Sequence, residues 1–417
     1  MNRRTFLKSL AAASCAALVG RVPRAWASLP KAKITRVRIY EPPDVNPLFN
    51  QSNMVVTVET DANITGIGEG GSKDTLVQCA GRLIGKNPFD IERCWQDMYL
   101  AHFYPPGREK IHALGALDLA LWDIKGKALD VPVYDLLGGM NRKYCECYPT
   151  GAPPGVALPR LAAGEAIKAR AKGVIEAGYR AFRLDAASVR GGGTTYNARE
   201  RVHQVAADCK MAREGVGKDG DWLIDFHQRF ALNDALRGCK AIEEYEPFLV
   251  EDPVRADAFL EDIPKLRHMT TVPLAAGEEW GQRWDFNKLV ENHDLDYIRA
   301  TLPNVGGITE MHKVCGICET HNVGMVPHFT GPIATAALLH LLGPFPGPVL
   351  FEYNYGNRAI PYLPECLDFK EGKLYANGRP GLGVKLDLEK VKPVAEITHP
   401  GENRTTYYRP DGSQTNW

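Results

Sequence analysis

Leu223-Ile224-Asp225 is the first of three short apolar runs that each end in an acid. The other two are Leu249-Val250-Glu251 and Leu274-Ala275-Ala276-Gly277-Glu278. The three acids are 26 and then 27 residues apart, which is enough chain for one strand, one helix and their connections. The spacing therefore predicts parallel strands joined by helices, with an acid at the carboxyl end of each of these strands.

The same rhythm extends on both sides of this stretch. From about Cys145 onward, short apolar runs recur, and each is followed by a turn and a helical pattern. An open doubly wound sheet would alternate in the same way, but no G-x-G-x-x-G turn follows the first run. The pattern predicts an α/β fold with a (β/α)8 barrel at residues 144–363. The strand runs end near Tyr148, Leu184, Asp225, Glu251, Glu278, Thr301, His328 and Glu352.

The region before the barrel has a different pattern. Alternating apolar residues within 34–39 and 55–58 predict antiparallel strands. Further on, apolar residues three and four apart predict one buried helix face, at Leu114, Leu117, Leu121 and Ile124. We predict an α+β capping domain at residues 28–143, to which the tail at 364–417 returns.

Residues 1–27 have the features of an export signal. The motif Asn2-Arg3-Arg4-Thr5-Phe6-Leu7-Lys8, the apolar residues 9–20 and the small-residue site Ala25-Trp26-Ala27 are typical of a twin-arginine signal peptide. The apolar part is shorter than the roughly 20 residues that span a bilayer. We therefore expect a periplasmic protein that is exported by the twin-arginine route and has no membrane segment after cleavage.

The overall composition narrows the choice of partners. The 50 Lys and Arg residues balance the 50 Asp and Glu residues, and no basic stripe stands out, so nucleic acid is not an expected partner. The ten cysteines are scattered, which argues against a disulfide framework. We expect a small-molecule ligand and a homo-oligomer.

Asp225, Glu251 and Glu278 are candidate metal ligands. Because the carboxyl ends of parallel barrel strands meet at one mouth, the three acids should converge there. Each acid alone could simply cap the following helix. Three converging carboxylates instead repel one another unless a cation holds them, and oxygen ligands favour Mg²⁺, with Mn²⁺ as the alternative.

Two histidines and a fourth acid are expected to join this site. His227 lies two residues beyond Asp225, so on an extended strand end both side chains would point to the same side. His328 ends the seventh run, and an imidazole beside a metal-bound carboxylate can exchange protons near neutral pH. Glu352 ends the eighth run and should hydrogen-bond substrate or orient a histidine.

These residues resemble the mandelate racemase and muconate lactonizing branch of the enolase superfamily. Besides the three acids, the resemblance rests on the motifs at residues 115–127, 132–139 and 306–310, and it covers nearly the whole mature chain. Within the branch, Asp225-Phe226-His227-Gln228-Arg229 and the segment around His328 are most similar to sugar-acid dehydratases of the galactonate and mannonate kind.

The resemblance implies a metal-dependent hydro-lyase that acts on a sugar acid. Such an enzyme removes the proton beside the carboxylate, forms an enediolate and eliminates the 3-hydroxyl group to give a 2-keto-3-deoxy acid. The resemblance also implies that His227 delivers a proton to the departing hydroxyl. Sugar contacts are expected from the capping-domain loops, with Asn50 and His102 as candidates, and from Arg229 and Trp280 in the barrel.

Two positions depart from the pattern of these relatives and leave the proton-abstracting base open. Where many relatives carry Lys-x-Lys, this chain has Arg183-Leu184-Asp185, and an arginine does not lose its proton. Thr301 stands where relatives have an aspartate paired with the seventh-strand histidine. The base is either Tyr196, made more acidic by Arg183 as in mannonate dehydratases, or His328.

Two other functions compete with dehydration. A racemase or epimerase would use the same enediolate but needs a competent base at the second strand, which Arg183-Leu184-Asp185 does not offer. A non-catalytic sugar-acid binding protein could keep the barrel, but binding alone would not require all three acids and both histidines.

Overall fold

The structure is a computed structural model that describes residues 28–43, 54–100, 107–150, 163–184, 195–255, 260–354, 360–401 and 406–415. The twin-arginine motif and the predicted substrate contacts Asn50 and His102 lie outside the described residues. Within the described part of the chain, no helix combines the length and the apolar character that crossing a membrane requires.

Eight parallel strands form the barrel, as the spacing of the apolar runs predicted. Six of them lie in the order β10-β9-β8-β7-β6-β5, and β11 pairs in parallel with β4. The ring closes where β4 lies beside β5 and where a parallel bridge joins Met325 to Val349. The strands are β4 (Cys145–Pro149), β5 (Ala181–Leu184), β6 (Asp221–Asp225), β7 (Leu249–Glu251), β8 (Leu274–Ala276), β9 (Tyr297–Ile298), β10 (Gly324–Met325) and β11 (Phe351–Tyr353).

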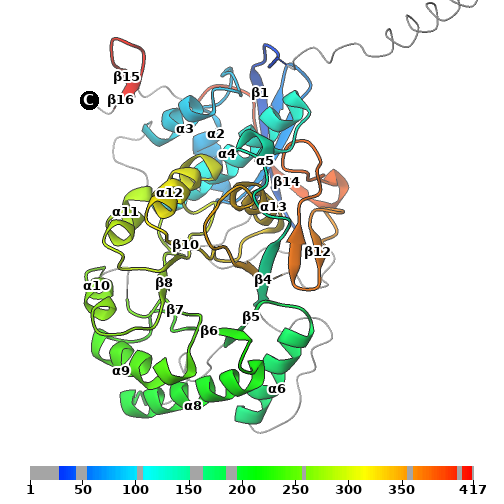
Figure 1. Ribbon diagram of the computed structural model, residues 1–417. Coiled ribbons are helices and arrows are strands. Elements are labelled where there is room, and N and C mark those ends of the chain that lie inside the picture. The colour runs from blue at the N-terminus through cyan, green and yellow to red at the C-terminus, as the bar shows by residue number, and fades with distance from the viewer. Residues whose placement is uncertain are drawn as a thin grey trace, which may run out of the picture.

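Helices connect these strands and cover the outside of the barrel (Figure 1). Because the helix-facing side chains of the strands are apolar, they share one large core with the inner faces of the helices. The barrel helices are α6 (Ala163–Glu176), α8 (Ala198–Val216), α9 (Leu232–Ile242), α10 (Asp262–Arg267), α11 (Arg283–Glu291), α12 (Ile308–Thr320) and α13 (Pro332–Leu342), and a 3-10 turn η2 (Glu243–Tyr245) follows α9.

A second, smaller domain lies at one end of the barrel (Figure 1). It contains an antiparallel sheet in the order β14-β1-β2-β3, and its long helix α4 packs on β3. Its elements are β1 (Ile34–Glu41), β2 (Val55–Thr60), β3 (Thr65–Glu69), α2 (Lys73–Ala80), α3 (Ile91–Leu100), α4 (Arg108–Leu129), α5 (Val133–Leu136) and, from the tail, β14 (Lys392–Ile397).

The tail contributes to both domains. Its first hairpin, β12 (Asp368–Lys370) and β13 (Lys373–Tyr375), pairs with β4 of the barrel, and β14 then pairs with β1 of the smaller domain. A short turn η3 (Leu388–Lys390) precedes β14, and a last hairpin, β15 (Tyr407–Tyr408) and β16 (Gln414–Thr415), lies beside α3. The tail therefore ties the smaller domain to the barrel.

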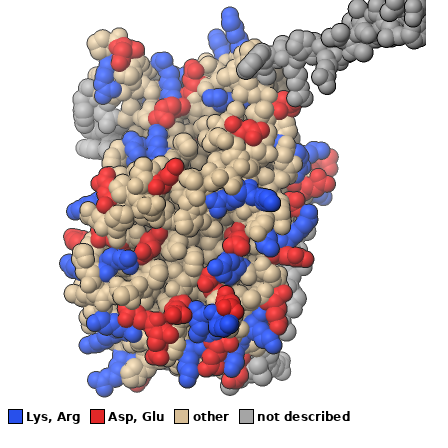
Figure 2. Space-filling view, in the orientation of Figure 1, with Lys and Arg blue, Asp and Glu red and all other residues tan. Residues whose placement is uncertain are grey.

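Charged side chains are mixed on the visible surface, and the described cysteines form no disulfides. On the face shown in Figure 2, basic and acidic side chains are interspersed, with no large area of one sign. All nine described cysteines are free and buried, including Cys315 and Cys318 within α12. This pair therefore contributes to packing within the helix layer.

Candidate active site at the barrel mouth

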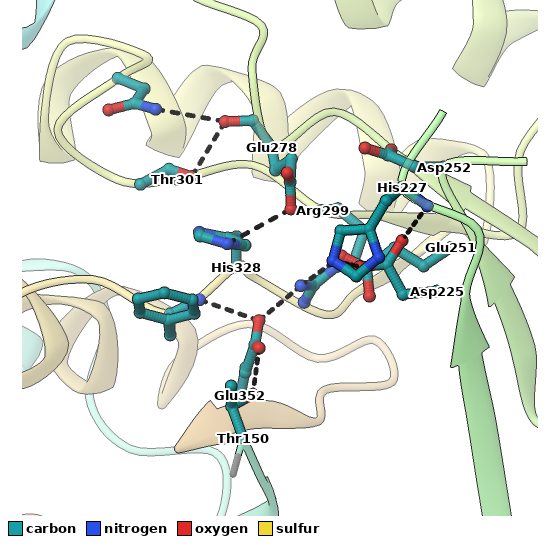
Figure 3. Close-up of polar contacts among 12 residues, drawn as sticks. Thr150, Asp225, His227, Glu251, Asp252, Glu278, Arg299, Thr301, His328 and Glu352 are labelled. Atoms are coloured by element: carbon teal, nitrogen blue, oxygen red, sulfur yellow. Dashed lines mark hydrogen bonds and ion pairs between the residues drawn. The ribbon is translucent and has the colours of Figure 1, made fainter. Parts of the chain in front are cut away.

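The three predicted acids lie at the same end of neighbouring strands. β6 ends at Asp225, β7 ends at Glu251, and β8 ends two residues before Glu278. In the parallel register Asp225 is opposite Glu251, and Glu251 is opposite Ala275. Asp225 and Glu251 are at most 1% exposed, and Figure 3 shows all three acids pointing into one region.

Two buried arginines contact these acids. Arg183, on β5, places its Nη2 atom 2.5 Å from Asp225 Oδ2 and its Nε atom 3.9 Å from Glu251 Oε2. Arg299, which directly follows β9, is fully buried, and its Nη2 atom lies 2.6 Å from Glu251 Oε1 and 2.5 Å from Glu352 Oε2. The arginines thus compensate part of the negative charge that burial concentrates here.

The remaining charge shifts the pKa values of the acids in opposite directions. Burial raises the pKa of Glu251 to about 7, although Arg299 opposes the rise. Burial, followed by the nearby Asp252 and Glu251 carboxylates, raises the pKa of Glu278 well above its usual range. For Asp225, burial acts upward, but His227 and Arg183 outweigh it and lower the pKa. After burial, the nearby Asp225 and Glu352 also act to raise the pKa of Glu251, so the carboxylates still repel one another despite the arginines.

A divalent cation fits this set of donors. All the acids offer oxygen atoms, and two buried oxygens, Glu251 Oε2 and Asp252 Oδ1, accept no hydrogen bond from the described residues. However, no three His, Cys, Asp or Glu side chains in the described ranges are already close enough together to hold a metal ion. The metal site therefore stays a prediction.

His227 reaches the site by a different route from the one expected. The strand ends at Asp225, and His227 and Gln228 adopt φ angles of +48° and +56°, which non-glycine residues seldom adopt. This turn, rather than strand alternation, brings His227 Nε2 within 2.6 Å of Asp225 Oδ2. The backbone N–H of His227 also donates to Asp225 Oδ1, at 2.6 Å. Backbone strain of this kind is common at functional sites.

His328 lies in the same region, between two acids (Figure 3). It is 5% exposed, and its Nε2 atom is 3.3 Å from Glu278 Oε2. Burial lowers the pKa of His328 to about 4, so its imidazole is neutral near pH 7 and can accept a proton. Thr301 does not pair with it, because the Thr301 hydroxyl donates to the Glu278 carbonyl oxygen at 3.0 Å.

Glu352 holds the back of the site together. It is 4% exposed and accepts hydrogen bonds from Arg299, from the Thr150 hydroxyl and from the backbone N–H of Phe329. Burial would raise its pKa, but Arg299 and His328 outweigh burial and hold the pKa far below its usual range. Glu352 is therefore an ionised acid that links β11 to the segment carrying His328.

The expected pair of Arg183 and Tyr196 is not formed in the structure. Arg183 contacts Asp225, His227 and Glu251, whereas Tyr196 is 55% exposed. Burial and the nearby Asp234 raise the pKa of Tyr196, which is the opposite of the expected phenolate. Residues 185–194, which connect the two, lie outside the described residues. The observed arrangement gives Tyr196 no support as the base.

Arg229 and Trp280, the two other predicted substrate contacts among the described residues, differ in exposure. Arg229 is exposed in the turn after β6, close along the chain to His227. Trp280 is 4% exposed, and its ring packs edge-on against Phe286 with the ring centroids 5.1 Å apart. The ring of Trp280 is therefore packed in the hydrophobic core, although Trp280 follows Glu278 closely along the chain.

Sequence reasoning missed Arg299, Asp252 and Thr150. Arg299 follows Tyr297-Ile298 directly, so a cation at the end of an apolar run was the available signal. Asp252 is 2% exposed, and burial and two nearby acids raise its pKa well above its usual range. Together with the predicted residues, these groups form a buried, strongly charged site with two histidines on its border. Such a site can bind an anion through arginine, bind a cation through carboxylates and move protons.

Two family models match the chain. The model described as mandelate racemase / muconate lactonizing enzyme, N-terminal domain, matches residues 45–138. The model described as enolase C-terminal domain-like matches residues 166–391. Together they include most of the smaller domain and most of the barrel, and they leave out β1, β4 and β14.

Similar proteins agree with these matches. A D-galactonate dehydratase of Xanthomonas oryzae pv. oryzae (strain PXO99A) is 35% identical over 413 residues, which cover 92% of this chain and all of that protein. A D-galactonate dehydratase of Variovorax paradoxus (strain S110) is 33% identical over 404 residues, with the same coverage of both chains. A solved structure of an enolase superfamily member from Salmonella Typhimurium has a TM-score of 0.80 and 27% identity, and it covers 88% of this chain and all of that chain.

Proposed function

Because this chain belongs to the mandelate racemase and muconate lactonizing enzyme family of the enolase superfamily, we propose that it dehydrates a sugar acid. The product would be a 2-keto-3-deoxy acid, formed by loss of the C2 proton and the C3 hydroxyl group. The observation that carries this proposal is the convergence of three acids, of which Asp225 and Glu251 are buried, from adjacent strands with two histidines at one barrel mouth.

The three acids are the proposed ligands of one divalent cation, Mg²⁺ or Mn²⁺. Asp225, Glu251 and Glu278 provide the oxygen ligands, and Glu251 Oε2 is a buried oxygen that accepts no hydrogen bond from the described residues. When bound, the ion would supply positive charge that stabilises the sugar acid after it has lost its C2 proton. Its charge would also oppose the effects of burial and of neighbouring acids, which raise the pKa values of Glu251 and Glu278.

The two histidines are assigned opposite proton transfers. His328 lies between Glu278 and Glu352 at the barrel mouth, with its Nε2 atom 3.3 Å from Glu278 Oε2, so it is the proposed acceptor of the C2 proton. His227 is more exposed and contacts Asp225 and Arg183, and it is the proposed donor of a proton to the departing hydroxyl group. In this assignment the base, His328, follows strand β10, and the acid, His227, follows strand β6.

Arg299 and Glu352 are proposed to orient the reacting groups. Arg299 donates to Glu251, to Glu352 and to the backbone oxygen of Val326, and these contacts fix its guanidinium group in a fully buried position. A fixed guanidinium group can stabilise a carboxylate of the substrate without reorganising during the reaction. Glu352 in turn fixes the backbone beside His328 through the N–H group of Phe329.

The test is a panel of sugar acids of different C2 and C3 stereochemistry, incubated with the protein and Mg²⁺. We expect at least one acid, with D-galactonate as the first choice because two similar proteins carry that name, to give a 2-keto-3-deoxy product. Each reaction is repeated in D₂O. Exchange of the C2 proton without formation of a keto acid on any substrate would replace dehydration by racemisation or epimerisation.

We also propose that the protein is exported and forms a homo-oligomer. The support for export is the twin-arginine motif Arg3-Arg4 followed by an apolar run and the Ala25-Trp26-Ala27 site. Mass spectrometry of the protein recovered from the periplasm should give a chain that begins after residue 27. Light scattering should give a mass above that of one chain. A full-length monomer in the cytoplasm would contradict both statements.

A further inference from the structure

Glu69 is a buried acid of the smaller domain that contacts the barrel. It is the last residue of β3 and is only 1% exposed. Its Oε2 atom accepts the backbone N–H of Ile333 at 2.9 Å and that of Ala334 at 3.0 Å. Both donors belong to the first turn of α13, which belongs to the barrel.

Glu69 takes the place of the missing N-cap side chain of α13. The first N–H groups of a helix have no partner within the helix, and an N-cap side chain usually accepts one of them. The N-cap residue of α13 is Gly331, which has no such side chain. A Cβ atom on Gly331 would lie 2.1 Å from the Glu69 carboxyl carbon, so only glycine leaves room for the acid. The cap of this helix therefore comes from the other domain.

The capped helix turn lies directly after the segment that carries His328. That segment is fixed on the site side where Arg299 donates to the Val326 oxygen at 2.8 Å and where Phe329 donates to Glu352 at 3.0 Å. On its other side, the segment runs into Gly331, whose oxygen accepts the N–H of Thr335 in α13. The position of the first turn of α13 thus sets the position of the end of this segment.

We propose that Glu69 is a positioning residue that holds the segment between His328 and α13, so that the imidazole stays in place at the barrel mouth. The proposal rests on the proposed function, because it gives His328 a reacting role. The geometry of the site would then depend on how the smaller domain packs against the barrel. Displacement of a reacting group by about 1 Å can lower a rate by about 100-fold.

The carboxyl group can fill this role without a charge. Burial raises the pKa of Glu69 to about 8, even though the N–H groups of Ala334 and Ile333 act to lower it. A protonated carboxyl still accepts hydrogen bonds at its carbonyl oxygen, and a glutamine amide does the same. Glu69→Gln should therefore preserve the contact, whereas Glu69→Leu should remove it at similar size.

A matched control exists in the same domain. Asp123 is fully buried and accepts two backbone N–H groups, from Ile67 at 2.9 Å and from Leu382 at 2.8 Å, and it also forms an ion pair with Lys127 Nζ at 2.6 Å. Neither of these donors adjoins the segment of His328. Asp123→Asn keeps an oxygen that can accept backbone N–H groups but removes the ion pair with Lys127, so it reports the general effect of disturbing a buried carboxylate of this domain.

The experiment compares these three variants in steady-state kinetics and in hydrogen–deuterium exchange with Mg²⁺ present. For Glu69→Leu we expect kcat to fall by about 10- to 100-fold with little change in KM, and amide exchange to accelerate at residues 326–336. Glu69→Gln should restore most of the kcat and the slow exchange. Asp123→Asn should lower thermal stability without changing kcat or the exchange of this segment.

Unchanged exchange at residues 326–336 in Glu69→Leu would overturn the proposal, and so would an equal loss of kcat in Asp123→Asn. If the wild-type protein dehydrates no sugar acid, the proposed function fails. The exchange data then still decide whether Glu69 holds the segment. The two failures can therefore be told apart.

Discussion

Two adjacent layers inside the barrel are built from the same strands but differ in chemistry. The lower layer is apolar and fully packed, with Ala181, Leu223, Leu249 and Ala275 all buried. The upper layer, two residues further along the chain from each of these, contains Arg183 and Asp225, which contact each other, together with Glu251 and, just beyond β8, Gly277 and Glu278.

The difference shows how one scaffold separates stability from chemistry. Side chains two residues apart on a strand point to the same side, so each strand contributes to both layers with a single change of residue type. The lower layer gains free energy from apolar burial. The upper layer is costly to bury, because each charge there needs a partner or an ion. Such a cost is typical of functional sites.

The largest expected effect follows from a change in the upper layer, Glu251→Gln. It removes the charge of a proposed metal ligand, so turnover should fall by at least ~10³-fold, which is about 4 kcal/mol in the barrier. Thermal stability should also fall, because Arg299 and Arg183 lose the charge of a buried partner. Steady-state kinetics and thermal unfolding measure both. Full activity in this variant would refute the metal assignment.

His227→Asn separates the two proton transfers at this layer. General acid catalysis contributes about 10²- to 10⁴-fold, so dehydration should slow by about 10²-fold or more. Exchange of the C2 proton with D₂O should continue, because His328 is untouched. Proton NMR of the recovered substrate detects this exchange. Loss of exchange together with dehydration would mean that His227, not His328, removes the proton.

Leu249→Ala changes the lower layer, two residues before Glu251 on β7. It leaves a cavity in a packed core, so the free energy of unfolding should fall by about 2–3 kcal/mol. The kcat of the folded protein should change little, since no charged group is altered. Denaturant unfolding and kinetics at low temperature measure the two effects. A large loss of kcat with unchanged stability would show that the layers are not separate.

Glu69→Gln tests a buried acid outside the barrel through pH. Burial raises the pKa of Glu69 from its usual value of 4.5 to about 8 in the folded state. Between pH 4.5 and 8 the folded state therefore keeps the proton, whereas the unfolded state loses it. The wild-type protein should therefore lose stability relative to the variant as pH rises. Between pH 6 and 8 we expect a relative loss of about 2 kcal/mol. Parallel pH curves of unfolding free energy would contradict the raised pKa.

The smallest effect is expected for Tyr196→Phe. Tyr196 is 55% exposed and interacts with Asp234 rather than Arg183, so the rate should change by no more than about twofold. The measurement is kcat/KM on the best acid of the panel. A loss greater than about 100-fold would restore the Arg183–Tyr196 pair as the base.

The barrel and its mouth were predictable from local patterns. The spacing of the apolar runs located the strands, and the acids that end three of them located the site, because parallel strands bring their carboxyl ends together. Arg299 was missed because a single cation after an apolar run carries no periodic signal. Its role depends on Glu251 and Glu352, which are far away along the chain.

Other features depended on contacts that no sequence spacing encodes. His227 was expected on an extended strand, yet two consecutive left-handed residues turn it toward Asp225. Trp280 was expected to touch substrate, yet its ring packs against Phe286 in the core. The cap of α13 by Glu69 joins residues 264 positions apart, so only the folded structure reveals it.

The most direct test of this account is a calorimetric titration of metal-free protein with Mg²⁺, repeated with Mn²⁺. We predict one ion per chain for the wild-type protein and no saturable binding for Asp225→Asn or Glu251→Gln, both measured after confirming that the variants are folded. Absence of binding in the wild-type protein, or unchanged binding in both variants, would contradict the claim that these acids gather around one cation.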